Sequence, residues 1–169
     1  MSAAAEIPGF VPDAGNTRLL RDAFGRFATG VTIVTVAGED GPVAITANSF
    51  SSLSLDPPLV LWSPDRKSRR FGHFAHATHY VIHVLAAEQA DLCFGVSKDA
   101  WKLGEHDLEL NAQGVPVIPG ALARFDCTRE VTHDGGDHVI VVGRVDRCEM
   151  RDGTPLVFYA GKTVRIAQD

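Results

Sequence analysis

The sequence predicts a mainly β domain, built as an antiparallel barrel with a few peripheral helices. Three observations predict it. Apolar runs with strand character outnumber helical patterns, tight turns join most of them, and strands and helices do not alternate as βαβ units. The chain has 169 residues, of which 45% are hydrophobic and 22% are charged, as is typical of one soluble globular domain. We therefore expect one core, with no internal repeat and no second domain.

The N-terminal part of the chain is expected to contain an arm and a first helix. Residues 1–15 are rich in Ala, Pro and Gly, which predicts a flexible arm before a barrel domain over residues 16–169. Leucine and phenylalanine recur at helical spacing over residues 18–27. Asn16 or Thr17 can cap this helix, and Gly30 follows its end.

Short strands dominate the rest of the chain. Two apolar runs flank the segment Gly38 to Pro42, whose Gly, Asp and Pro residues favour a tight turn and predict a hairpin. The polar stretch from Trp101 to Gly120 is interrupted by Gly and Pro and predicts a loop. The expected strands are 31–36, 43–47, 59–63, 80–85, 122–131, 138–150, 156–159 and a short strand after 161, and the further expected helices are 68–77 and 88–96.

Charge and cysteine usage argue against several classes of protein. The net charge is −5, and the only basic cluster, Arg66 to Arg70, suits a small anionic ligand better than a nucleic acid. No apolar run approaches the ~20 residues that cross a bilayer, and the first residues lack a secretory signal. Cys93, Cys127 and Cys148 lack disulfide or zinc spacing and are expected to be buried thiols. We expect a cytoplasmic protein with no nucleic-acid or membrane partner.

The stretch from Thr46 to Pro58 places hydroxyl groups and an amide at the end of an expected strand. A flavin ring needs such donors and acceptors along its pyrimidine edge, together with apolar contacts for its other end. A hydroxyl-rich loop that satisfies its own backbone is the alternative that the residues leave open.

A second candidate site is the turn from His133 to His138. Its two glycines allow a tight turn and a close approach of the backbone to a flat ring. His138, at the start of a strand, suits the carboxamide of a nicotinamide. A hairpin turn with an ordinary surface histidine is the alternative.

Other motifs argue against other chemistries. Gly161-Lys162-Thr163 is no phosphate loop, because Leu156 stands where the first glycine would fall, and no Gly-x-Gly-x-x-Gly is present. The sequence also lacks the Gly-x-Ser-x-Gly elbow of a serine hydrolase. Four histidines, at positions 73, 76, 79 and 83, have no nearby cysteine or carboxylate to complete a zinc site, so no metal is expected.

Several separate segments of the sequence, taken in their order along the chain, are similar to the segments of one protein family. They are residues 27–35, 46–61, 80–85, 120–123 with Cys127, 133–138 and 155–161. Together they resemble the flavin reductase family, the small reductase components of two-component flavin-dependent monooxygenases. The likeness extends from Leu20 to Arg165, nearly the whole chain.

The resemblance implies an antiparallel FMN-binding split barrel of the Greek-key type, assembled as a homodimer. It implies an NAD(P)H:flavin oxidoreductase that transfers hydride from NADH or NADPH to FMN or FAD and supplies reduced flavin to a partner monooxygenase. Two alternatives stay open. One is a split-barrel flavoprotein that holds its flavin tightly and acts on another substrate, and the other is a non-catalytic flavin-binding module.

The resemblance also implies the site residues. His138 would position the nicotinamide, and basic side chains would face the flavin phosphate, as phosphate recognition by guanidinium groups and helix amides leads one to expect. The flavin-side residues would be Pro42, Val43, Ala44, Ile45, Thr46, Ala47, Asn48, Ser49, Ser63, Pro64 and Asp65, with Ser68, Arg69 and Arg70 at the phosphate. The nicotinamide-side residues would be Gly136, Asp137, Tyr159, Ala160, Gly161 and Lys162.

Overall fold

A computed structural model describes residues 9–105, 108–164 and 166 of the chain. The strands are β1 (Thr29–Gly30), β2 (Thr32–Gly38), β3 (Gly41–Ala47), β4 (Ser51–Leu55), β5 (Pro58–Trp62), β6 (His79–Val84), β7 (Glu109–Leu110), β8 (Pro116–Val117), β9 (Ala123–Gly135), β10 (His138–Met150), β11 (Val157–Tyr159) and β12 (Lys162–Val164). The helices are α1 (Thr17–Phe24), α2 (Phe71–His76) and α3 (Ala90–Lys98), with short 3₁₀ helices η1 (Ala87–Gln89) and η2 (Lys102–Glu105). The fold is mainly β, as predicted.

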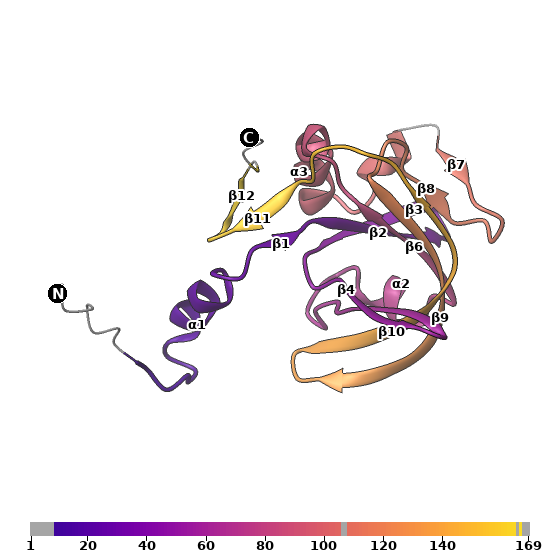
Figure 1. The fold of residues 1–169 in the computed structure, drawn as a ribbon. Coiled ribbons are helices and arrows are strands. Elements are labelled where there is room, and N and C mark those ends of the chain that lie inside the picture. Colours follow the sequence, from indigo (N-terminus) through magenta and orange to yellow (C-terminus); the bar gives the residue numbers. More distant parts are fainter. Residues whose placement is uncertain (1–8, 106–107, 165, 167–169) are drawn as a thin grey trace.

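Seven antiparallel strands form the main sheet, in the order β3-β2-β6-β9-β10-β5-β4, and it curls into the predicted split barrel (Figure 1). The split lies between β3 and β4. These strands follow each other in the chain but occupy opposite edges of the sheet, and no ladder among the described residues joins them. The barrel therefore stays open between β3 and β4, and the hydroxyl-rich segment begins at the end of β3 and runs through β4.

The core has two parts because β2 is buried on both faces. Val34 and Val36 pack inside the barrel, in a cluster that includes the fully buried Trp62. Ile33 alternates with them and packs on the outer face against Val96 of α3. Successive side chains of a strand face opposite sides of the sheet. The side chains of β2 that point away from the barrel interior are therefore buried by α3 on the outer face.

His83 on β6 joins three segments of this outer layer. The side chain is fully buried, its Nδ1 lies 3.1 Å from the Ile33 carbonyl oxygen, and its Nε2 accepts the Ile118 amide at 3.0 Å. An amide N–H can only donate, so the ring proton sits on Nδ1 and donates to Ile33. Burial lowers the pKa of His83 to about 4, and the neutral ring links β6, β2 and the segment beside β8.

The helix α1 lies apart from the barrel, beside the β11–β12 hairpin (Figure 1). None of its residues is buried. It is held through the segment that follows it, where the Ala160 amide donates to the Gly25 carbonyl at 2.8 Å and β1 pairs with β11. Ala160 and Gly161 both have positive φ, as a two-residue hairpin turn requires.

The structure corrects the expected first helix, which ends at Phe24 and not near position 27. Asn16 precedes it but does not cap it with its side chain. Instead the Asn16 side chain accepts the Asp13 amide and donates to the Val11 carbonyl. Residues 1–8 lie outside the described part of the chain, so the predicted arm over residues 1–15 stays a prediction.

Other corrections concern strands and a cysteine. The serine-rich segment of β4 was not expected to be a strand, and as an edge strand it pairs only with β5 and leaves most of its side chains exposed. The expected loop over 101–120 contains η2, β7 and β8. Cys93 and Cys127 are buried as expected, but Cys148 is exposed on β10.

Within the described residues, no helix combines the length and the hydropathy that a membrane span requires.

The buried imidazole makes a prediction about acid stability. Because the pKa of His83 is lower in the folded chain than the ordinary 6.5, the unfolded state binds more protons as the pH falls. The stability from the neutral ring is complete above pH 6.5 and should decline towards pH 4, by roughly 3 kcal/mol in the free energy of unfolding.

Urea titrations of wild-type protein and His83→Gln at pH 7 and pH 4.5 measure this contribution. The variant should be less stable at pH 7 but should lose less stability on acidification. Equal pH slopes for the two proteins would contradict the assignment.

Candidate functional site

A backbone tie joins the end of β5 to the tip of the β9–β10 hairpin. The Val139 amide donates to the Pro64 carbonyl at 3.2 Å, and the Arg66 amide donates to the Asp137 carbonyl at 2.9 Å. An ion pair between Arg66 and Asp134 adds a side-chain link. The tie places the predicted flavin-side residues 63–65 directly beside the predicted nicotinamide-side histidine, which forms a β-bridge with Asp65.

His138 is oriented by its neighbour in the chain. Its Nδ1 lies 2.8 Å from Oδ1 of Asp137, and the hydrogen bond from the imidazole holds the pKa of that carboxyl below its usual value. An ionised carboxylate only accepts, so Nδ1 carries a proton. Nε2 has no hydrogen-bond partner among the described residues. The ring is thus fixed at one nitrogen, and the other remains available for a ligand.

An apolar cleft of about 350 Å³ opens beside the end of β3. We name it the inner cleft, and its described lining is Val31, Thr46, Ala47, Asn48, Cys93, Phe94, Ser97, Phe158 and Thr163. Burial raises the pKa of the Cys93 thiol, so this side chain stays protonated and acts as apolar lining. A cleft with mostly apolar sides and a few hydroxyl and amide groups fits a flat heteroaromatic ring such as that of a flavin.

A second, larger groove of about 600 Å³ adjoins the inner cleft. We name it the outer groove, and its described lining is Arg21, Asp22, Phe24, Gly25, Arg26, Phe27, Thr29, Asn48, Asp65, His138, Phe158, Ala160 and Gly161. The two cavities share Asn48 and Phe158. Because both cavities contain Asn48, two ligands bound in them would meet at this residue. Thr29, which also lines the outer groove, has a buried Oγ1 without a hydrogen-bond partner among the described residues.

Arg70 closes the free edge of β3. Its guanidinium donates to the carbonyl of Ala44 at 3.3 Å and to that of Ser97, at the end of α3, at 3.2 Å. The Ala44 amide donates to Ala100 at 2.9 Å. Both edge-facing groups of Ala44 are thus satisfied without a neighbouring strand. This arrangement holds α3 against β3 and so fixes two sides of the inner cleft.

The structure places some of the predicted site residues in the lining of the two cavities and others outside it. Thr46, Ala47 and Asn48 line the inner cleft, and Asn48, Asp65, His138, Ala160 and Gly161 line the outer groove. The remaining predicted residues line neither cavity: Pro42, Val43, Ala44, Ile45, Ser49, Ser63, Pro64, Ser68, Arg69, Arg70, Gly136, Asp137, Tyr159 and Lys162.

Several of these remaining residues support the lining. The Ser49 hydroxyl accepts the Ser63 amide at 2.9 Å and so connects the two predicted flavin segments. The Ser68 hydroxyl accepts the Arg70 amide at 3.2 Å. Arg69 is exposed and has no ion-pair partner among the described residues. Ligand contacts for all of them stay predictions.

Sequence reasoning missed the lining that comes from helices. Cys93, Phe94 and Ser97 of α3 and the residues around Arg21 and Arg26 lie far in the chain from both predicted motifs. Their only sequence signal is the amphipathic character of each helix, which says that a helix packs somewhere but not against which strand.

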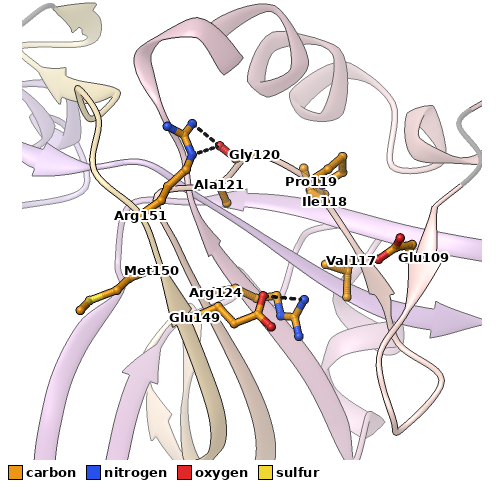
Figure 2. Close-up of a pocket in the computed structure, with 10 residues that line it drawn as sticks. All are labelled: Glu109, Val117, Ile118, Pro119, Gly120, Ala121, Arg124, Glu149, Met150 and Arg151. Atoms are coloured by element: carbon orange, nitrogen blue, oxygen red, sulfur yellow. Dashed lines mark hydrogen bonds and ion pairs between the residues drawn. The ribbon is translucent and has the colours of Figure 1, made fainter.

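A third cavity, of about 430 Å³, lies between the segment 117–121 and the facing parts of β9 and β10 (Figure 2). Its charged groups serve the fold, because Arg124 pairs with Glu149 at 3.1 Å and Arg151 donates to the Gly120 carbonyl at 3.1 Å (Figure 2). None of the predicted site residues lines it. Among the described residues, no three His, Cys, Asp or Glu side chains are placed to hold a metal ion.

Fold and cavities together define a split-barrel protein with two adjoining clefts. The chain belongs to the flavin reductase family: the family model described as "Flavin reductase like domain" matches residues 24–167.

Relatives over nearly the full length support this membership. The chain is 50% identical to the FMN reductase (NADH) SmoA of Agrobacterium fabrum over 159 residues, 94% of this chain and 91% of the relative. It is 40% identical to the reductase subunit HsaB of a flavin-dependent monooxygenase of Rhodococcus jostii, over 93% of this chain and 82% of the relative. The solved structure of the NADH:FAD oxidoreductase SgcE6 of Streptomyces globisporus aligns with a TM-score of 0.87 at 33% identity, covering 97% of this chain and 95% of that one.

Proposed function

We propose that the protein transfers hydride from NADH or NADPH to FMN or FAD and supplies the reduced flavin to a partner monooxygenase. The observation that carries the proposal is the pair of adjoining cavities that share Asn48 and Phe158, one apolar and one bearing His138. Relatives named as an NADH-dependent FMN reductase and as a monooxygenase reductase subunit support it.

The chain's own residues need only hold and orient the two rings. Bound together, the nicotinamide supplies a hydride and the flavin accepts it, so the cofactors carry the chemistry. Thr46 and Asn48 offer polar groups to the ring in the inner cleft, while Phe94 and Phe158 offer apolar contact. His138, steadied by Asp137, positions the nicotinamide carboxamide. Orientation of this kind contributes much of the rate when no acid or base is required.

Whether the flavin is a diffusible substrate or a tightly held group is tested by its release. Equilibrium dialysis of the protein with FMN or FAD should show free exchange of flavin. Retention after exhaustive dialysis would favour the alternative of a flavoprotein that acts on another substrate.

The free thiols Cys93, Cys127 and Cys148 support the proposal that the protein works in the reducing cytoplasm.

Replacement of His138 tests the proposed nicotinamide position. His138→Ala should raise the KM for NADH by about tenfold, the loss of roughly one good hydrogen bond, while the KM for flavin changes less than twofold. His133→Ala is the matched control, since His133 lies exposed on β9 of the same hairpin and lines neither cavity. Steady-state oxidation of NADH with varied flavin measures both constants. An unchanged KM for NADH in His138→Ala would contradict the assignment of His138 to the nicotinamide.

The homodimer is supported by the exposed helix α1. A helix of eight residues is too short to be stable in water by itself, yet none of its residues is buried and Leu19 is 52% exposed. We infer that a second copy of the chain covers its apolar face.

Sedimentation velocity of the full chain tests the dimer, which should be the main species. Leu19→Asp should weaken it at least tenfold, because an apolar contact is replaced by a charge. Leu110→Asp, at an exposed leucine of β7, is the control and should leave the dimer intact. A monomeric wild-type protein would contradict the proposal.

A further inference from the structure

Two arginines of the outer groove have no role in the proposed hydride transfer. Arg21 belongs to the last turn of α1, and Arg26 follows one residue after the Gly25 that ends it. Their place is fixed by the backbone, because the Gly25 amide donates to the Arg21 carbonyl at 2.9 Å and the Gly25 carbonyl accepts the amide of Ala160. The β11–β12 turn thus holds both arginines at the groove that contains His138.

Both guanidinium groups are free for a ligand. Neither Arg21 nor Arg26 has an ion pair or a side-chain hydrogen bond with any described residue, although other surface arginines such as Arg144 and Arg147 do. Two acids line the described part of the groove. The carboxylate of Asp65 accepts the Lys67 amide at 2.8 Å, and Asp22 is exposed on α1 and forms no ion pair with either arginine among the described residues. Arg21 and Arg26 are the cationic side chains among the described lining residues that carry a fixed charge at neutral pH.

The ligand chemistry that matches this pair is a diphosphate. Guanidinium groups bind phosphate oxygens through paired, charge-assisted hydrogen bonds. A nicotinamide dinucleotide whose ring lies at Asn48 and His138 would run along the outer groove, since the proposed function assigns the inner cleft to the flavin ring. The flavin phosphate, by contrast, is assigned to the loop of Arg69, which does not line the outer groove.

We propose that Arg21 and Arg26 bind the diphosphate of the nicotinamide dinucleotide and so set its affinity. The proposal rests on the proposed function, because it takes the nicotinamide position from His138. It assigns a binding role to α1, the element that the barrel itself leaves uncovered.

The test uses ADP-ribose, which carries the diphosphate but no nicotinamide, and the full-length variants Arg21→Gln, Arg26→Gln and the double variant. Calorimetry should show the Kd for ADP-ribose rising about tenfold in each single variant, with the Kd for FMN unchanged. The KM for NADH should rise in parallel. The Kd of the wild type should depend more steeply on salt than that of the double variant.

Arg18→Gln is the matched control, because Arg18 is exposed on the same helix but does not line the groove. It should bind ADP-ribose as the wild type does. Equal affinities in the wild type and the double variant, or an equal loss in Arg18→Gln, would overturn the proposal while leaving the hydride transfer intact. A wild-type protein that neither binds ADP-ribose nor oxidises NADH would overturn both.

Discussion

The candidate site depends on the tie between the end of β5 and the tip of the β9–β10 hairpin. Two backbone hydrogen bonds and the Arg66–Asp134 ion pair bring Asp65 beside His138, although 72 intervening residues separate them in the chain. Each such bond contributes only about 1 kcal/mol net, but together they hold the tip of the hairpin against the residues that follow β5. The ladder between β5 and β10 already aligns the two strands from Val141 onwards. The tie continues this alignment to the tip of the hairpin, so that His138 lies beside Asp65 at the outer groove.

The split in the barrel is the second constraint. A closed barrel would pair β3 with β4, and its interior would be filled by side chains. Here Arg70 and Ala100 satisfy the edge of β3 at Ala44, so the strand needs no neighbour at that point and α3 lies over it instead. The burial of part of Arg70 lowers the pKa of its guanidinium, which nevertheless stays charged at neutral pH. The inner cleft exists because the edge is satisfied by a side chain and a loop.

Local patterns predicted much of the fold. The strand-rich pattern and the turns at Gly38 to Pro42 and at Gly136 predicted the mainly β class and the hairpins, because turn residues act locally. The serine-rich β4 escaped prediction, since an edge strand that buries little lacks the apolar signal. In the site, Asn48 and His138, which the resemblance named, both line the outer groove, and their ligand contacts stay predictions. Phe94, Arg21 and Arg26 were not predicted as lining residues. Long-range packing decides which helix lies against which strand, and local sequence patterns do not show it.

The central claim is that this protein, with no monooxygenase present, holds flavin and nicotinamide in adjoining cavities for direct hydride transfer. Anaerobic rapid mixing of the purified protein with NADH and FMN tests it most directly, with the flavin absorbance followed over time. Direct hydride transfer should bleach the flavin rapidly in the absence of any monooxygenase, at a rate that saturates with NADH. Flavin that binds but keeps its absorbance with both NADH and NADPH would contradict it.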